Sequence, residues 1–214
     1  MLGLPVYYYY KRADIPAATH LPVLVMMGKC FKVRRVLEFG AGTFSTLTFL
    51  DRAVFPDVEQ VVSFETDPSW KQRVEKAAGE DKRLQVVLIA DDVDKLAARC
   101  DISAFDLVFV DNGPTAEVRT ATIAEIARRN NDGTLVVVHD FEIPDYRQAS
   151  NKSRYRFCFT AYCPHTGILS TPSRIDRTMR SKFRHMNKAM TQLAKELDPT
   201  DVCAWTRVIN KTLQ

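Results

Sequence analysis

The chain has 214 residues, of which 46% are hydrophobic and 26% are charged. This length and composition predict one globular domain and exclude a disordered chain, a collagen and a disulfide-stabilised miniprotein. The formal charge of +4 is concentrated in residues 171–214, which hold nine basic and four acidic residues, so the nearly neutral remainder argues against a dedicated nucleic-acid binder with a basic face over its main domain.

The first 33 residues are predicted to form an N-terminal arm followed by one helix over 17–29. The arm carries four consecutive tyrosines at 7–10. These tyrosines could line an aromatic substrate pocket, or they could form a surface arm or a subunit contact.

Residues 34–170 alternate between short apolar runs and longer polar stretches with helical spacing. The runs have the usual length of strands, and their continuous apolar character is typical of a parallel sheet covered on both faces. They occupy 35–39, 60–64, 84–89, 105–110 and 134–138. Four helices are predicted between them. The first covers 44–53, and the second begins at Pro68 with Asp67 as N-cap. A short third helix runs from Asp91 or Asp92 to about 98, and the fourth covers 115–129 and is stopped by residues 131–133. Five such repeats predict a doubly wound α/β fold.

The last part of the chain does not continue this alternation of apolar runs and polar stretches. Residues 156–162 and 166–170 predict a hairpin that turns near Pro164. A helix of roughly 23 residues is then expected from about Ser173, because apolar residues recur at spacings of 3 and 4. These residues are Met179, Phe183, Met186, Met190, Leu193 and Leu197. Residues 202–209 are predicted as a closing strand.

This basic C-terminal helix has three interpretations. It could dock on its own sheet with a solvated basic face. Its heptad-like spacing could form the seam of a homodimer. It could also contact RNA or an anionic membrane.

The first candidate site is the turn between the first strand and the following helix, Glu38-Phe-Gly40-Ala41-Gly42-Thr-Phe-Ser45-Thr46. Its glycines let the backbone pass close to a ligand. A dinucleotide site would require a third glycine where Ser45 stands and usually an apolar residue where Glu38 stands. An anion at that place is poorly suited to a pyrophosphate and well suited to the cationic amino-acid end of S-adenosylmethionine.

Glu38-x-Gly40-x-Gly42 resembles the first motif of class I S-adenosylmethionine-dependent methyltransferases. The fuller run resembles a subgroup with a Gly-x-Gly-x-x-Ser-Thr loop, and the likeness spans roughly residues 19–168. It implies one domain over 1–214 with a Rossmann-like, mainly parallel seven-stranded sheet and a C-terminal helical extension. The cofactor-binding residues that it implies are Glu38, Gly40, Ala41, Gly42, Ser45, Thr46, Glu65, Asp91 and Asp111.

Three acidic residues at strand ends acquire roles from this resemblance. Glu65, after the second strand, would accept hydrogen bonds from both ribose hydroxyls. Asp91, after the third strand, would contact the adenine amine, although Asp91 or its neighbour could also cap a helix. Asp111 ends the fourth strand, where open α/β sheets place their ligands. Relatives usually have Asp-Gly-Pro there and an arginine further on, for which Arg119 is the candidate.

The predicted catalytic residues are Asp111, His139 and Asp140, which would converge over the transferred methyl group. His139 could act as a general base, since its ordinary pKa lies near neutrality. Alternatively, Asp111 and Asp140, together with His139, could hold a divalent cation, as in catechol-type O-methyltransferases. Those enzymes usually have Asp-Asn at this place, so the cation is not favoured, and His139 could also be purely structural.

The favoured function is therefore S-adenosylmethionine-dependent O-methylation of a small molecule. An RNA methyltransferase that uses the basic C-terminal helix and a non-catalytic cofactor-binding protein are the alternatives, whereas Glu38 and Ser45 disfavour a nicotinamide oxidoreductase. Five cysteines without a Cys-x-x-Cys pair predict reduced thiols and a cytoplasmic protein. No apolar run is long enough to span a membrane.

Overall fold

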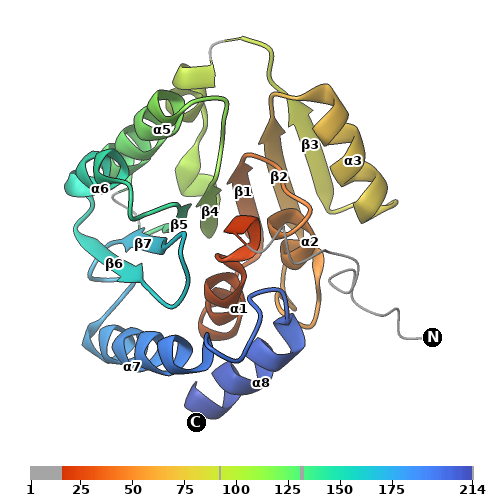
Figure 1. The fold of residues 1–214 in the computed structure, drawn as a ribbon. Coiled ribbons are helices and arrows are strands. Elements are labelled where there is room, and N and C mark those ends of the chain that lie inside the picture. Colours follow the sequence, from red (N-terminus) through yellow and green to blue (C-terminus); the bar gives the residue numbers. More distant parts are fainter. Residues whose placement is uncertain (1–15, 92, 131–132, 214) are drawn as a thin grey trace.

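The computed structural model describes residues 16–91, 93–130 and 133–213 (Figure 1). These residues form a seven-stranded sheet in the order β3-β2-β1-β4-β5-β7-β6. The first five strands are parallel, which confirms the predicted doubly wound fold. They are β1 (Arg35–Phe39), β2 (Gln60–Glu65), β3 (Leu84–Leu88), β4 (Leu107–Val110) and β5 (Leu135–His139).

The predicted hairpin is also confirmed. It consists of β6 (Tyr155–Phe159) and β7 (Thr166–Ser170), which pair antiparallel, and β7 in turn pairs antiparallel with β5. The order of the parallel strands reverses between β1 and β4. In open α/β sheets such a reversal opens a crevice at the carboxyl ends of the strands.

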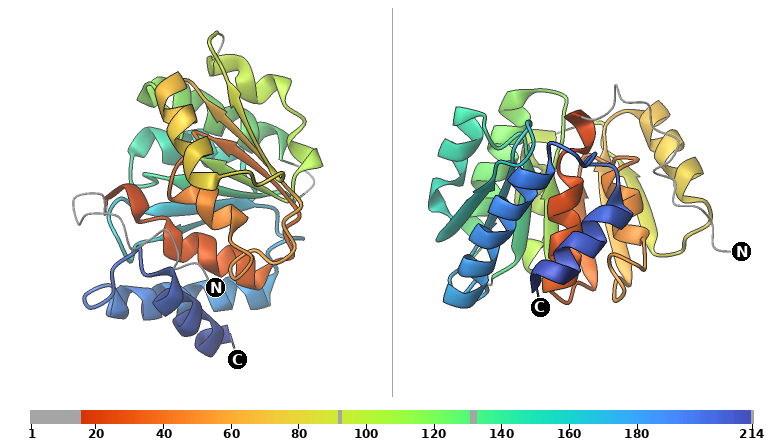
Figure 2. Two further views of the ribbon diagram at one scale, coloured as in Figure 1. Left: turned by 90° about the vertical axis from the view of Figure 1, so that its right-hand side faces the viewer. Right: turned by 60° about the horizontal axis from the view of Figure 1, so that its bottom comes forward.

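Helices cover both faces of this sheet (Figure 2). They are α1 (Leu21–Cys30), α2 (Ser45–Leu50), α3 (Pro68–Ala78), α4 (Leu96–Arg99), α5 (Ala116–Arg129), α6 (Pro144–Ala149), α7 (Arg177–Leu193) and α8 (Val202–Leu213). Successive strand residues point to opposite faces. Leu107 and Phe109 thus join the cluster under α1, α2, α7 and α8, while Val108 and Val110 join the cluster under α4, α5 and α6.

The helix after β2 begins where the sequence predicts. The Asp67 side chain accepts hydrogen bonds from the backbone N–H groups of Ser69 and Trp70, and Pro68 occupies the first helical position. Further along, Thr115 caps α5 in the same way. The residues at 131–132, predicted to stop α5, and the tyrosines at 7–10 lie outside the described residues.

The predicted closing strand over 202–209 is wrong, because this segment is α8. Val202, Trp205 and Ile209 are buried at helical spacings of three and four, and Asp201 accepts the N–H of Ala204 at the start of the helix. A short apolar run fits a strand and a buried helix equally well, so periodicity alone could not separate them.

The helix predicted from about Ser173 is shorter than expected. It begins at Arg177, where Asp176 accepts the N–H of Met179, and it ends at Leu193. Phe183, Met186 and Met190 of its apolar stripe are buried in the main core of the same chain. Helices α7 and α8 therefore contribute to the core of the domain, and the apolar stripe of α7 packs against other residues of the same chain.

All five cysteines are free thiols, as predicted. No helix in the described part of the chain is both long and apolar enough to cross a bilayer.

Candidate cofactor and acceptor site

The turn after β1 approaches the turn after β4 very closely. Gly40 has a φ of +90°, and a Cβ there would lie 2.5 Å from the carbonyl oxygen of Asp111. Only glycine suits both the dihedral angle and the space. On the other side, Trp70 donates its indole N–H to the carbonyl oxygen of Ala41 at 2.6 Å, so Trp70 holds the loop as well as packing against it.

Glu38 is fully buried at the start of this loop. Its Oε2 accepts hydrogen bonds from Thr46 Oγ1 and Ser63 Oγ, both at 2.5 Å. Burial raises the pKa of Glu38 to about 7, against the effect of hydrogen bonds from Ser45, Ser63 and Thr46. Neither Glu38 nor Thr46 is among the residues that line the cavity in front of this loop or the slot beside that cavity. The structure thus places these two predicted cofactor residues where they shape the loop.

A cavity of about 380 Å³ lies in front of the loop. Such a volume is typical of a small-molecule site. The predicted residues that line it are Gly40, Ala41, Gly42, Ser45, Glu65 and Asp111. His20, Trp70 and Arg73 line it too, and neither His20 nor Arg73 was assigned a site role from the sequence.

A narrow slot of about 20 Å³ adjoins this cavity, because Gly40, Glu65 and Gly113 line both. The far wall of the slot is apolar, with Ile89 and Leu96 among its residues. Asp91 is exposed and lines neither hollow. The structure therefore does not bring Asp91 together with the other predicted residues.

Glu65 is held at the junction of the two hollows by its own backbone neighbours. Its Oε1 accepts the N–H groups of Thr66 at 2.6 Å and Asp67 at 2.9 Å. These bonds fix the carboxylate at the carboxyl end of β2, facing the loop after β1.

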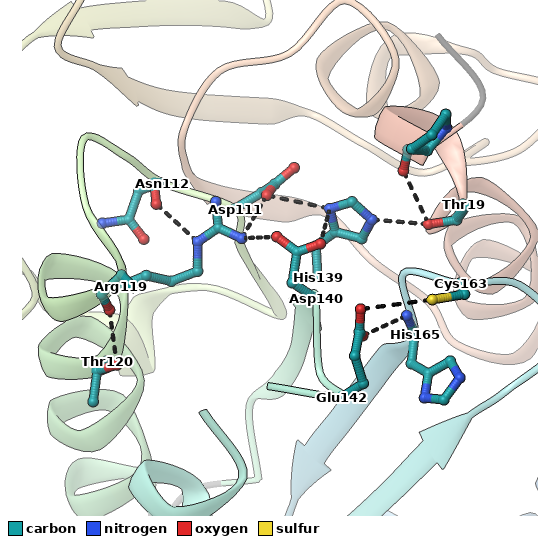
Figure 3. A network of polar contacts seen from close by, with 12 residues as sticks. Thr19, Asp111, Asn112, Arg119, Thr120, His139, Asp140, Glu142, Cys163 and His165 are labelled. Carbon is teal, nitrogen blue, oxygen red and sulfur yellow. Dashed lines mark hydrogen bonds and ion pairs between the residues drawn. The ribbon is translucent and has the colours of Figure 1, made fainter. Parts of the chain in front are cut away.

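The predicted catalytic residues meet in one polar network (Figure 3). Arg119 Nη1 lies 2.5 Å from Asp140 Oδ2 and 3.0 Å from Asp111 Oδ1. Arg119 Nε also donates to the carbonyl oxygen of Asn112 at 2.8 Å. Arg119, the candidate for the arginine after this turn, thus pairs with Asp111, and Asn112 supplies one of its acceptors.

His139 joins this network through both ring nitrogens. Its Nδ1 lies 3.3 Å from Asp111 Oδ1, and its Nε2 lies 2.9 Å from Thr19 Oγ1. Burial lowers the pKa of His139, but the carboxylates of Asp111 and Asp140 outweigh burial and raise it above its usual value. Burial likewise raises the pKa of Asp111, but His139 and Arg119 outweigh it and hold that pKa low. Asp140 has a φ of +57°, a strained conformation of the kind found at functional sites.

His20 is not among the predicted site residues, but the structure places it at the wall of the cavity. It precedes α1, is 2% exposed, and packs edge-on against His139 with ring centroids 4.8 Å apart. Among the described residues, neither of its ring nitrogens has a hydrogen-bond partner. Burial, followed by the proximity of His139, lowers its pKa to about 3, so the imidazole is neutral. A lone histidine ahead of the sheet carries no motif that could have marked it.

Asp111 and Asp140 are the predicted cation ligands, and in the structure both pair with Arg119. The side chains that the structure brings together as candidate ligands are instead His20, Asp111 and His139, whose ligand atoms all lie within 4.8 Å of one another.

Comparisons with known proteins agree with this geometry. Residues 37–141 match a family model described as a methyltransferase domain. The N-methyltransferase NodS from Bradyrhizobium japonicum WM9, solved in complex with S-adenosyl-L-homocysteine, is similar in fold, with a TM-score of 0.53 and 12% identity over 78% of this chain and 92% of that one. A putative O-methyltransferase from Klebsiella pneumoniae is 20% identical over 79% of this chain and 84% of that one, with a TM-score of 0.47. No curated protein sequence matched. Residues 37–141, which hold the glycine turn and most of the residues that line the cavity, thus form an S-adenosylmethionine-dependent methyltransferase domain.

Proposed function

We propose that this methyltransferase transfers the methyl group of S-adenosylmethionine to an oxygen atom of a small molecule. The observation that carries the proposal is the position of Asp111. Its side chain lines the cofactor-sized cavity and also belongs to the polar network of His139, Arg119 and Asp140. A hydroxyl group bound at this wall would therefore meet both the methyl donor and the groups that orient it.

The cavity and the slot together suit the cofactor. The glycine loop gives backbone access through Gly40, and Glu65 stands where the two hollows join. The apolar residues of the slot lie beside that junction. Arg73, which lies over the Trp70 ring, adds a positive charge at the other end of the cavity. We infer that Glu65 holds the ribose and that the loop holds the amino-acid end, with Glu38 and Thr46 supporting the loop from behind.

S-adenosylmethionine supplies an electrophilic methyl group on a sulfonium. The chain itself contributes alignment of the acceptor with that methyl group, which can account for a large part of the barrier reduction. Asp111, held in place by His139, would orient the acceptor hydroxyl and accept its proton as the bond from sulfur to the methyl group breaks and the bond from oxygen to the methyl group forms. Arg119 holds Asp111 and Asp140 in place, so the two carboxylates are fixed before the substrate binds.

The first test is calorimetric titration with S-adenosylhomocysteine. We expect Glu65→Ala to weaken binding at least tenfold, because the residue lines both hollows. Glu59→Ala, which removes a carboxylate with 67% of its side chain exposed, should bind as the wild type does. Equal binding by Glu65→Ala and the wild type would remove Glu65 from the cofactor site.

The second test is transfer of a radiolabelled methyl group to matched panels of phenols, alcohols and amines. Product from the oxygen acceptors alone supports the proposal. Product from amines alone overturns it. Cofactor binding with no product from any panel member would favour the non-catalytic alternative.

The RNA methyltransferase alternative rests on the basic C-terminal helix α7. Arg177, Arg184 and Lys188 are exposed on this helix. Charge reversal of Arg184 and Lys188 should abolish RNA binding and leave cofactor binding unchanged if this alternative holds. The homodimer and the cytoplasmic location stay predictions, and the apolar stripe of α7 no longer supports the dimer because it is buried within the chain.

A further inference from the structure

We propose that His20, Asp111 and His139 form a binding site for a divalent transition-metal ion of the zinc and cobalt type. The ion would have two imidazole ligands and one carboxylate ligand, and its remaining positions would face the cavity that His20 and Asp111 line. Its binding can be tested without activity. Its role, to hold an oxygen atom of the acceptor, rests on the proposed function.

The first argument comes from the unpaired imidazole of His20. A buried polar group without a hydrogen-bond partner is costly, and most such groups in proteins meet a partner, a water molecule or an ion. His20 is 2% exposed, both of its ring nitrogens lack a partner among the described residues, and it lines the cavity. A cation at this wall would satisfy one nitrogen.

The second argument comes from the hydrogen-bond chain behind His139. Thr19 has one hydroxyl proton, and Thr19 Oγ1 donates it to the carbonyl oxygen of Pro16 at 3.2 Å. When Thr19 makes this bond, its Oγ1 can only accept a hydrogen bond from the Nε2–H of His139, 2.9 Å away. This leaves Nδ1 of a neutral His139 with its lone pair directed at Asp111 Oδ1, 3.3 Å away.

Two acceptor atoms at that distance need a positive charge beside them. The charge can be a proton on His139, or it can be a metal ion bound by both atoms. Ligand atoms around an ion with bonds of about 2.0–2.2 Å lie roughly 3–3.5 Å apart, and Nδ1 and Oδ1 already match this separation. The third ligand, His20, lies within 4.8 Å of the other two ligand atoms.

The surroundings supply what metal sites usually have outside their ligands. Metal-bound histidines commonly donate their other N–H to an oxygen atom, and His139 has Thr19 in that place. Asp111 is positioned by Arg119. Asp111 and Asp140 together carry two negative charges against the single positive charge of Arg119, so the site retains negative charge for a cation.

The donor set also selects the kind of metal ion. Imidazole ligands suit zinc and the neighbouring transition metals, whereas magnesium and calcium prefer all-oxygen sites. Asp140, which the sequence suggested as a ligand, is instead the partner of Arg119 at 2.5 Å. Its place in the ligand set is taken by His20.

The test is Co²⁺ titration of the chelator-treated full chain, followed by visible absorption. Every protein in this experiment should carry Cys163→Ser and Cys203→Ser, because these exposed thiols could bind Co²⁺ by themselves. We expect the wild-type site to give d–d bands that Zn²⁺ abolishes by competition and that Mg²⁺ leaves unchanged. His20→Gln should weaken Co²⁺ binding at least tenfold, and His185→Gln, on an exposed part of α7, should not.

Folding is checked separately by S-adenosylhomocysteine titration of His20→Gln. If Co²⁺ does not bind, or binds equally well to wild type and His20→Gln, the metal site is overturned. If Co²⁺ binding depends on His20 but no oxygen acceptor is methylated, the metal site stands and the proposed function falls. If methyl transfer to an oxygen acceptor survives chelation and no Co²⁺ spectrum develops, the proposed function stands and the metal site falls.

Discussion

Thr46 Oγ1 donates a 2.5 Å hydrogen bond to Glu38 and accepts the N–H of Gly42 at 3.0 Å. The Thr46 hydroxyl group therefore links two earlier parts of the chain. These are the buried side chain of Glu38, eight residues before Thr46, and the glycine turn at Gly42, four residues before it. The anion at position 38 acts through the loop, since Glu38 is fully buried and does not line the cavity.

This relationship predicts an unusual pH dependence of stability for Glu38. Burial raises its pKa to about 7 from an ordinary 4.5, so the folded state binds more protons than the unfolded state between these values. Its contribution is fully present below pH 4.5 and is lost as the pH rises through 7. The shift corresponds to about 3 kcal/mol of unfolding free energy.

Glu38→Gln should remove this loss, since the amide carries no charge at any pH and its carbonyl oxygen can still accept both hydroxyls. Urea unfolding at pH 5 and pH 8.5 measures the difference between wild type and variant. The exposed Glu59→Gln is the control. A pH profile for Glu38→Gln that parallels that of the wild type would show that Glu38 is ionised in the folded protein without cost.

Gly40→Ala tests the close approach of the β1 and β4 turns. A Cβ at this position would meet only backbone atoms, at 2.5 to 2.9 Å, so the turns must separate. We expect at least a tenfold loss of S-adenosylhomocysteine affinity by calorimetry.

Gly79→Ala is the matched control for this substitution. Gly79 also has a positive φ, of +65°, but a Cβ there meets nothing within 4 Å. It should cost about 1–3 kcal/mol of stability through backbone strain and leave cofactor affinity unchanged. Equal cofactor affinity in the two variants would mean that the close approach of the β1 and β4 turns is not needed for cofactor binding.

The sequence predicted the site best where residues follow strands directly. Glu65, Asp111 and His139 each end a strand, and parallel strands bring their carboxyl ends to one edge, so position along the chain determines position in space. Asp91 failed as a cavity residue because it lies in the irregular segment beyond β3, where chain position no longer determines direction.

His20 and Arg73 could not be predicted for a related reason. They reach the cavity from helical regions packed around the sheet, α1 and α3, and only the tertiary packing of these helices decides which side chain faces inward. The same holds for α8. Its short apolar segment is compatible with a strand or a helix in the sequence, and its packing against α1 and α7 favours the helix.

Trp205→Ala measures how far the C-terminal helices belong to the fold. The Trp205 ring is fully buried, packs edge-on against Tyr162, and donates its N–H to the carbonyl oxygen of Asp198 at 3.0 Å. Its removal should cost about 3–5 kcal/mol in urea unfolding. Arg207→Ala, on the exposed side of α8, should stay within about 0.5 kcal/mol of the wild type. A small effect at Trp205 would mean that residues 171–214 are a separable extension after all.

Arg119→Met tests whether one guanidinium group organises the acceptor side of the site. Arg119 is 12% exposed and bridges Asp111 and Asp140, so its loss leaves two partly buried carboxylates without their shared partner. Breaking a fully buried pair costs about 3–5 kcal/mol, and because these carboxylates are a quarter exposed we expect about 2 kcal/mol in urea unfolding. Arg119→Lys keeps the charge but cannot also donate to the carbonyl oxygen of Asn112 in the same geometry, so it should recover only part of that stability.

The control is Arg128→Met, which removes a 65% exposed arginine paired with Glu125 on the same helix and should change stability by less than about 0.5 kcal/mol. If Arg119→Met and Arg128→Met were equally stable, Asp111 and Asp140 would not depend on Arg119, and the preorganisation of the acceptor wall would need another cause.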